Sequence, residues 1–462
     1  MRRLSWWGER VVALAAIAAV VMASIAVSLA ITPMQKVSVA GQTVRVGAVA
    51  SLTASGPGVL ELFGQRLSTA VQFTGPVRPR LELSRITLDS EIENFVASDD
   101  MESPTNALGQ ALAAGWKRYF LLETVIAGLF ALFFAGAVVG WMRLSRRRTV
   151  VVLLASLLCV EAVNVGAVMV GARSAPDRLR GVNSLAALVG RAQLPAVPAA
   201  EGTDVGPVDA LVLGDSVAAG AGLPAVVQPT AQDRACGRSA DAFAENLAAV
   251  NRWRILNLAC GGATITAGVM GSQQAGDTVV PSQLAVAKTS EQVRVVIVSI
   301  GANDVGWTSL LRLCAMTPSC DNNASTAYFQ QQLAEFSLSY EQLLLRLREL
   351  PARPRLLINL YYDPFGGNQH CLAEHGFTPA KQRSLLALLH SLNEVLRKGA
   401  EAAGATPVRP DFTGHGLCDQ QPYVQGVNAS APFHPTTAGQ LAMALADQHA
   451  LRYEPTVTST TR

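Results

Sequence analysis

The sequence has 462 residues, and at roughly 100 to 200 residues per domain this length excludes a single small module. Half of the residues are hydrophobic, the mean hydropathy is +0.28 and only 15% are charged, against about 25% in ordinary soluble domains. The net charge of +3 is too even for a general nucleic-acid-binding protein, so no nucleic-acid partner is expected. The composition indicates either an unusually apolar interior or membrane segments.

Three segments are long enough to cross a bilayer, which requires about 20 predominantly apolar residues. They are Val11–Thr32, Tyr119–Met142 and Thr149–Ala172. The first exceeds the roughly 7 to 15 residues of a signal-peptide core, which favours an uncleaved anchor over a cleaved signal peptide. Glu123, Glu161 and Asn164 lie within the second and third segments. We expect hydrogen bonds to neighbouring helices there; a proton relay is the alternative.

Basic residues set the predicted orientation, because Lys and Arg stay on the cytoplasmic side of short loops. Arginines precede the first segment and cluster between the second and third, at Arg2, Arg3, Arg10, Arg143, Arg146, Arg147 and Arg148. Three crossings then place residues 33–118 and everything after Arg173 outside. The sequence therefore predicts a multi-pass cell-membrane protein in contact with membrane lipid.

Cysteine usage agrees with this orientation. Cys159 lies in the third apolar segment, and the other six cysteines fall in the region predicted to be outside. They are Cys236, Cys260, Cys314, Cys320, Cys371 and Cys418. An even set in an oxidising compartment is typical of disulfides. A zinc site is the alternative, but there is no Cys-x-x-Cys pair and no His at ligand spacing, so no metal is expected.

Composition divides the chain into six stretches. The predicted divisions are 1–32, cytoplasmic N-terminus and first membrane helix; 33–118, a small β-rich extracellular domain; 119–172, two membrane helices joined by a basic turn; 173–208, a linker; 209–452, an α/β domain; and 453–462, a tail. The β-rich assignment follows from period-two alternation, as in Leu81-Glu-Leu83. No catalytic residues are evident in that domain.

Short apolar runs alternate with long helical stretches after residue 209. The runs are Ala210–Leu213, Arg254–Leu258, Arg294–Ile300, Leu356–Tyr361 and Thr406–Val408, and the helices include Tyr328–Leu350, Lys381–Ala403 and Thr437–Ala450. Such alternation predicts βαβ units and a largely parallel sheet. In these sheets the functional groups gather where the strands end at their carboxyl edge.

Candidate functional residues follow three of these strands. Ser216 follows the first, the pair Gly261-Gly262 follows the second, and Asn303 follows the third, while His434 comes late in the chain. Ser216 taken alone is also explained as a helix N-cap. Together the four blocks supply a nucleophile, a general base and oxyanion donors.

In this order the blocks resemble those of the SGNH hydrolases, also called GDSL esterases or lipases: Gly214-Asp215-Ser216, then Gly262, Gly301-Ala-Asn-Asp304 and His434. The cysteine placement is most similar to the secreted actinomycete lipase-type branch. The resemblance covers about residues 209–452. It implies a flavodoxin-like three-layer α/β/α domain, here after three membrane helices and a β-rich insert. It also implies a carboxylic ester hydrolase without cofactor, acting on a small-molecule, lipid or glycan ester.

Carried over from the family, Ser216 is the nucleophile and His434 the base. The Ser216 and Gly262 amides and the Asn303 side chain form the oxyanion hole. The implied disulfides are Cys236–Cys260, Cys314–Cys320 and Cys371–Cys418. The family often has Asp three residues before the His, where this chain has Ala431. We therefore expect a Ser-His dyad whose imidazole is oriented by the Ala431 carbonyl, with Asp411 as a displaced-acid alternative.

Three aromatic residues just past strand ends are candidates to line an acyl or leaving-group pocket: Trp307, Tyr361 and Tyr362. Two other functions stay open at this stage. One is an acyltransferase or O-deacetylase acting on cell-envelope glycans, because transfer depends on an acceptor that outcompetes water. The other is a binding module on a hydrolase fold that has lost activity, which only the missing acid favours.

Overall fold

The computed structural model describes residues 2–86 apart from 40, 52, 54 and 76; 107–172 apart from 143–145; 178, 179, 182 and 184–191; and 206–453 apart from 321, 322 and 368–370. Most of the predicted linker 173–208, Arg143 of the basic turn, and the predicted tail after Tyr453 lie outside these residues. The chain forms two compact units, one mainly of residues 1–193 and one mainly of residues 194–462. Each is described by itself.

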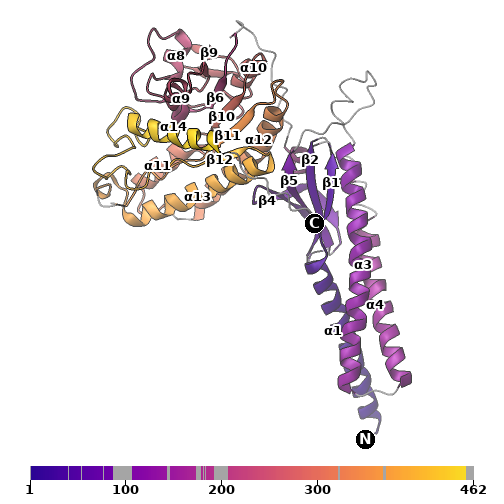
Figure 1. The fold of residues 1–462 in the computed structure, drawn as a ribbon. Coiled ribbons are helices and arrows are strands. Elements are labelled where there is room, and N and C mark those ends of the chain that lie inside the picture. The colour runs from indigo at the N-terminus through magenta and orange to yellow at the C-terminus, as the bar shows by residue number, and fades with distance from the viewer. Residues whose placement is uncertain are drawn as a thin grey trace. The chain divides into compact units, whose positions relative to one another are not determined.

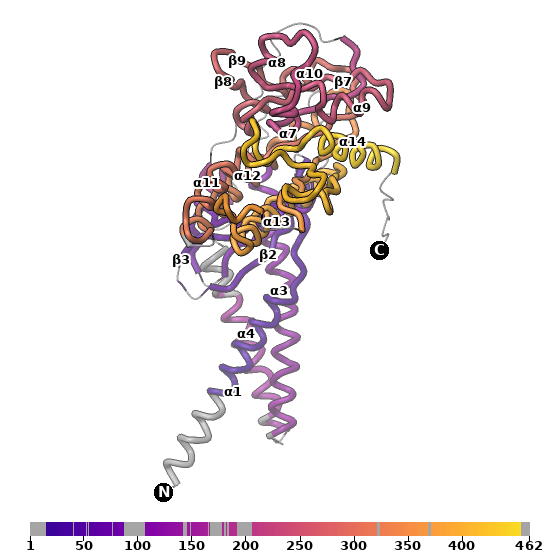
Figure 2. The backbone as a smooth tube through the Cα atoms, turned by 90° about the vertical axis from the view of Figure 1, so that its left-hand side faces the viewer, coloured from indigo at the N-terminus to yellow at the C-terminus, as the bar shows by residue number. Residues whose placement is uncertain are grey.

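Three apolar helices dominate the first unit and pack side by side (Figures 1 and 2): α1 (Arg2–Ile31), α3 (Ala107–Met142) and α4 (Arg146–Ala172). Small side chains at Ala127 and Ala131 let α3 approach Val21 and Val160 of the two other helices. By length and composition, one described helix, Ala107–Trp141, is long and apolar enough to cross a membrane; the apolar parts of the others, Ala15–Ile31 and Thr149–Asn164, are shorter. The helix α3 begins at Ala107, inside the region predicted to be β-rich.

Two of the three polar groups singled out within these helices, Glu123 and Asn164, are hydrogen-bonded to each other, and the described structure holds no hydrogen bond of Glu161. The fully buried Glu123 of α3 accepts hydrogen bonds from Ser28 of α1 and from Asn164 of α4, each at 2.6 Å. A buried carboxyl satisfied by neighbouring helices is the arrangement expected for a structural group.

A five-stranded sheet accompanies the helices, in the order β1-β2-β5-β3-β4. Its strands are β1 (Gln35–Val39), β2 (Gln42–Ala50), β3 (Ser55–Leu62), β4 (Gln65–Thr74) and β5 (Val77–Ile86). Alternate residues such as Leu81 and Leu83 are buried, as the period-two pattern predicts. The first unit also holds the one-turn helix α6 (Leu185–Leu188).

The second unit is built on a five-stranded parallel sheet in the order β12-β11-β10-β6-β7 (Figure 1). The strands are β6 (Ala210–Gly214), β7 (Ile255–Asn257), β10 (Val295–Ser299), β11 (Arg355–Asn359) and β12 (Thr406–Val408). Numbered along this domain the order is 2-1-3-4-5, the flavodoxin-like topology. After β6 the chain adds β7 on one side of it and then crosses back to add β10 on the other side, so the strand order switches between β6 and β10. Doubly wound sheets bind ligands at such a switch point.

Helices cover both faces of this sheet. On one face α9 (Phe243–Asn251) packs against α14 (Thr437–Arg452), and on the other α12 (Asn323–Arg348) packs against α13 (Pro379–Ala402) (Figure 2). The remaining elements are α7 (Ser216–Ala219), α8 (Ala231–Cys236), β8 (Gln273–Ala275), β9 (Thr278–Val280), α10 (Gln283–Lys288), α11 (Trp307–Met316) and the 3-10 turn η2 (Ala373–His375). The predicted parallel sheet is confirmed.

Candidate active site

Ser216 stands where β6 turns into α7, as its first helical residue. Asp215 caps that helix, because its Oδ1 accepts a hydrogen bond from the Val217 amide at 2.9 Å. Gly214 allows the close approach of β10: a Cβ at this position would lie 2.3 Å from the carbonyl oxygen of Ser299. The N-cap role considered for Ser216 thus belongs to Asp215, and the Ser216 hydroxyl is left for another partner.

That partner is His434, whose Nε2 lies 2.8 Å from Ser216 Oγ. Their sequence separation of 218 is bridged because the loop before α14 returns to the carboxyl edge of the sheet. Both side chains are partly buried. The structure therefore brings the predicted nucleophile and base within hydrogen-bonding distance.

The carbonyl at the other imidazole nitrogen differs from the predicted one. Nδ1 of His434 lies 3.0 Å from the Pro432 oxygen, whereas the Ala431 oxygen accepts from the His434 backbone amide at 3.3 Å. Residues 431–434 form a type II turn, with Pro at its second position and Phe433 at φ +63° at its third. The Ala431 carbonyl accepts the hydrogen bond that closes the turn, and the carbonyl next to His434 Nδ1 is that of the following residue, Pro432, instead of the predicted Ala431.

Asp411 is not brought to His434. It is exposed, and its carboxylate accepts from the Thr413 amide at 3.0 Å. Hydrogen bonding to the Thr413 side chain, together with this amide bond, holds the pKa of Asp411 below its usual value. The group within hydrogen-bonding distance of His434 Nδ1 is a neutral carbonyl.

The three predicted oxyanion donors lie on loops that follow β6, β7 and β10. The Ser216 and Gly262 amides have no acceptor among the described residues, and Gly262 adopts φ +77°, a left-handed conformation that favours glycine. The Asn303 amide nitrogen donates to the Ala263 oxygen at 2.9 Å, which fixes the side chain and leaves its second hydrogen available. This arrangement can hold a developing oxyanion.

A buried chain of hydrogen bonds links the nucleophile turn to the Asn303 loop. The Tyr361 hydroxyl, just past β11, donates to Asp215 Oδ2 at 2.9 Å and accepts from the Ala302 amide at 2.8 Å. Burial raises the pKa of Asp215 to about 6. Burial and the adjacent Asp215 also raise the pKa of Tyr361 above its ordinary value, so the tyrosine keeps the proton that it donates.

Asp304, beside Asn303, lies in the same buried region. Its Oδ1 accepts from the Ile265 amide at 3.0 Å, whereas Oδ2 is buried without a hydrogen bond in the described structure. Burial, together with the charge of Asp215, raises the pKa of Asp304 to about 7. The loop that carries Asn303 is thus tied to the loop that carries Gly262.

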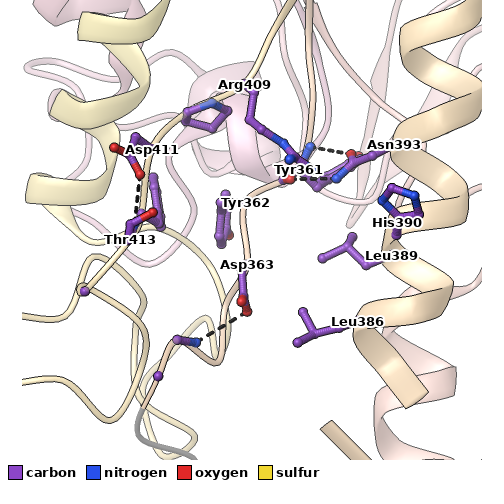
Figure 3. Close-up of a pocket in the computed structure, with 15 residues that line it drawn as sticks. Tyr361, Tyr362, Asp363, Leu386, Leu389, His390, Asn393, Arg409, Asp411 and Thr413 are labelled. Carbon is purple, nitrogen blue, oxygen red and sulfur yellow. Dashed lines mark hydrogen bonds between the residues drawn. The ribbon is translucent and has the colours of Figure 1, made fainter. Parts of the chain in front are cut away.

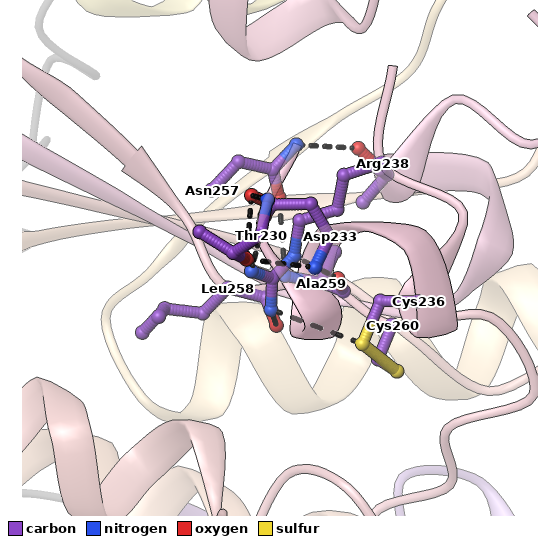
Figure 4. Close-up of polar contacts among 9 residues, drawn as sticks. Thr230, Asp233, Cys236, Arg238, Asn257, Leu258, Ala259 and Cys260 are labelled. Atoms are coloured by element: carbon purple, nitrogen blue, oxygen red, sulfur yellow. Dashed lines mark hydrogen bonds and ion pairs between the residues drawn. A yellow bond between two sulfur atoms is a disulfide. The ribbon is translucent and has the colours of Figure 1, made fainter. Parts of the chain in front are cut away.

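The Gly262 loop is held from its other side by Arg238 (Figure 4). The guanidinium donates to the carbonyl oxygens of Leu258 and Ala259 at 3.1 and 2.9 Å, and it pairs with Asp233 at 3.0 Å. The Cys236–Cys260 disulfide joins the same two segments. Cys314–Cys320 and Cys371–Cys418 are the other pairs in the structure, which are the pairings that the resemblance implies.

A small cavity of about 70 Å³ opens at Ser216, Asn303 and His434. Apolar side chains form much of its wall, among them Trp307, Leu311, Tyr362, Leu389 and Phe433. A larger cleft of about 650 Å³ shares Tyr361, Tyr362 and Leu389 with it and lies at the ends of β11 and β12 (Figure 3). The three aromatic residues singled out in the sequence therefore line the cavity at the candidate nucleophile.

The part of the chain that the structure describes contains no group of three or more His, Cys, Asp or Glu side chains that could hold a metal ion. Sequence reasoning missed the Pro432 carbonyl and the link through Tyr361. The link through Tyr361 had a signal in the sequence, because Tyr361 lies at the end of a predicted strand. The position of the Pro432 carbonyl had none, because it depends on a left-handed conformation of Phe433 that no local pattern indicates.

Known proteins are similar to the second unit of this chain. The family model of the GDSL-like Lipase/Acylhydrolase family matches residues 212–442, half of the chain. Lipase 1 of Streptomyces coelicolor is 27% identical over 274 residues, which cover 57% of this chain and 94% of that protein.

Two solved structures are also similar. An extracellular lipase from Streptomyces rimosus (21% identity, TM-score 0.39) covers 52% of this chain and 99% of its own. Phospholipase A1 from Streptomyces albidoflavus (21% identity, TM-score 0.39) covers 53% and 98%. From the family match and the curated lipase, the chain belongs to the GDSL-like lipase/acylhydrolase family and is a carboxylic ester hydrolase.

Proposed function

We propose that the chain is a membrane-anchored, outward-facing serine esterase that works through a Ser216–His434 dyad. The observation that carries the proposal is the 2.8 Å separation of His434 Nε2 from Ser216 Oγ, beside two amides without acceptors in the described structure. A decayed hydrolase would be expected to lose one of these groups, so the arrangement favours an enzyme over a binding module.

The proposed reaction proceeds in two halves. Ser216 Oγ attacks the ester carbonyl carbon while His434 Nε2 takes the hydroxyl proton, and the negative oxygen is held by the Ser216 and Gly262 amides and the Asn303 side chain. The C–O bond to the alcohol then breaks, and His434 gives its proton to the leaving oxygen. Water repeats the sequence on the acyl-serine, which releases the acid and restores Ser216.

The Pro432 carbonyl supports this role by accepting from Nδ1–H, because that bond selects the tautomer whose Nε2 is free to take the proton. A carbonyl does not neutralise an imidazolium as a carboxylate does. We therefore expect modest turnover at neutral pH compared with a Ser-His-Asp enzyme.

Hydrolysis of a short p-nitrophenyl ester tests the dyad. Ser216→Ala and His434→Ala are each expected to lower kcat by at least about 10³-fold, while His449→Ala, an exposed histidine on α14, retains wild-type turnover. Equal activity of the Ser216→Ala variant and the wild type would refute the dyad. Product analysis with a glycan acceptor present separates hydrolysis from acyl transfer, the alternative function.

Membrane anchoring is the second part of the proposal, with three spans corresponding to α1, α3 and α4. Large apolar side chains such as Leu121, Val125, Leu129 and Phe133 recur along one exposed stripe of α3, which suits contact with lipid. The basic residues flanking α1 and α4 support a cytoplasmic N-terminus. Residues 33–118 and 209–452 would then be separate extracellular domains, and the disulfides suit that compartment.

Protease treatment of intact cells carrying a tag at each end of the chain tests this topology. Three spans predict that the C-terminal tag is digested while the N-terminal tag is protected until the cells are lysed. Digestion or protection of both tags would require an even number of spans and contradict the proposal.

A further inference from the structure

The small size of the cavity at Ser216 bears on the acyl group, and this inference rests on the proposed esterase function. An apolar cavity of about 150 Å³ accommodates benzene, so a space of about 70 Å³ has room for roughly three non-hydrogen atoms. Trp307 and Leu311 of α11 wall it on the side that follows Asn303. A short acyl group fills this space, whereas a long acyl chain would have to extend beyond it.

The direction of the two substrate halves follows from the chemistry of the site. The carbonyl oxygen must lie at the Asn303 and Gly262 donors, and the leaving alcohol must lie within reach of His434, which protonates it. We place the acyl group beside Trp307 and the alcohol near His434, both of which line the cavity. Tyr362 lies on the His434 side, because its hydroxyl donates to the Phe433 oxygen at 2.7 Å.

Beyond Tyr362 lies the cleft of about 650 Å³, large enough for a drug-sized group. Figure 3 shows Asp411 and Thr413 on one side of it and His390 of α13 on the other, with Asp363 between. Arg409 also lines it, and no hydrogen bond or ion pair engages Arg409 within the described part of the chain.

The polar character of this cleft distinguishes it from a lipid site. Exposed side chains with charge or hydrogen-bonding capacity, Asp363, His390, Arg409 and Asp411, sit next to the stacked rings of Tyr362 and Phe412, whose centroids are 4.3 Å apart. Two carboxylates beside one guanidinium disfavour an anionic headgroup. Several donors and acceptors next to aromatic faces suit a neutral ligand with many hydroxyl groups.

We propose that the enzyme deacylates carbohydrates that carry short acyl esters, with the two- to four-carbon acyl group in the cavity beside Trp307 and the sugar in the cleft lined by Arg409 and Asp411. Trp307 limits the acyl length. Arg409 contributes to recognition of the alcohol without touching the reacting atoms.

The acyl half is tested with p-nitrophenyl acetate, butyrate and octanoate on the full-length protein in detergent. We expect wild-type kcat/KM to be at least about tenfold higher for butyrate than for octanoate, since misfit by single methylenes already costs that much. Trp307→Ala should raise the ratio of kcat/KM for octanoate to kcat/KM for acetate by about tenfold, and Trp307→Phe should raise it by less. Trp253→Ala, which removes a tryptophan that packs against Arg294 away from the cavity, is the matched control.

The alcohol half is tested by comparing an acetylated monosaccharide with triacetin, which carry the same acyl group on different alcohols. The sugar acetate should be the better substrate by about tenfold, and Arg409→Gln should remove most of that advantage by raising KM. Arg383→Gln, an exposed arginine of α13 outside the cleft, is the control.

The outcomes separate this inference from the proposed function. Octanoate turned over as fast as butyrate, or triacetin preferred over the sugar acetate, would overturn the substrate assignment while leaving the Ser216–His434 esterase intact. A wild-type protein that cleaves none of these esters would instead contradict the esterase function itself.

Discussion

Tyr361→Phe removes a single buried hydroxyl and leaves the ring in place. The hydroxyl bridges Asp215 Oδ2 and the Ala302 amide at 2.9 and 2.8 Å, so the variant leaves one buried acceptor and one buried donor unpaired. Each unpaired buried group costs about 1–3 kcal/mol, and we expect a loss of about 2–5 kcal/mol in the free energy of unfolding. Because Ala302 precedes Asn303, kcat should also fall by about 10 to 100-fold.

The stability loss should depend on pH. Burial raises the pKa of Asp215 from 3.8 to about 6, so the stability that protonation contributes is present below pH 3.8 and is lost as the pH rises through 6. The Tyr361 hydrogen bond lowers the pKa of Asp215 and so limits that loss. Without the bond the charged carboxylate is less favourable, and the destabilisation should be greater at pH 8 than at pH 5.

Stability is measured at pH 5 and at pH 8 as the urea concentration at which the rate of ester hydrolysis falls to half. The constants kcat and KM are measured in the absence of urea. Tyr340→Phe is the matched control, because this buried tyrosine donates to the neutral Leu396 carbonyl at 3.0 Å. It should lose stability equally at both pH values and keep its kcat. A Tyr361→Phe enzyme with kcat within threefold of wild type, or with equal destabilisation at both pH values, would refute the reasoning.

Three further changes follow from the structure. Burial raises the pKa of Asp447 to about 8, so wild-type stability should fall by up to about 1.4 kcal/mol per pH unit as the pH rises from about 4 to 8, and Asp447→Asn should flatten that slope in urea unfolding. Replacing both Cys236 and Cys260 by Ser opens a loop with a sequence separation of 24 and should cost about 3 kcal/mol, measured the same way. Asn303→Ala removes an oxyanion donor and should lower kcat by about 10² to 10³ with little change in KM.

Each of these variants has a control. Asp277→Asn, at an exposed carboxylate, should leave the pH slope unchanged, and a wild-type slope in Asp447→Asn would contradict the burial effect. Opening Cys314–Cys320, with a sequence separation of 6, should cost less, about 2 kcal/mol, so the reverse order would contradict the loop-closure reasoning. Asn246→Ala on α9 should keep its kcat, and an Asn303→Ala enzyme that matched it would exclude the oxyanion role.

The strands of the second unit could be predicted because fully buried strands such as Val295–Ser299 are continuous apolar runs. The order of those strands came from the family resemblance, since apolar runs carry no information about which strands pair. The start of α3 at Ala107 was missed. Its first turns are less apolar than the segment from Tyr119, and the hydropathy signal that marks a span does not mark the rest of the helix.

Part of the candidate site could also be predicted from the sequence, and part could not. Ser216, Gly262, Asn303 and His434 could be found because each occupies a short block with a fixed local geometry. The group at His434 Nδ1 could not, because it depends on a turn in which a non-glycine residue takes positive φ, and tertiary contacts rather than local preference sustain such residues.

Covalent trapping of the nucleophile tests the central claim most directly. The full-length protein is treated with a fluorophosphonate, and the modified residue is located by peptide mass spectrometry. We expect one adduct, on Ser216, with labelling abolished in Ser216→Ala and greatly slowed in His434→Ala. Labelling of another serine in the wild type, or undiminished ester turnover after complete modification of Ser216, would contradict the account.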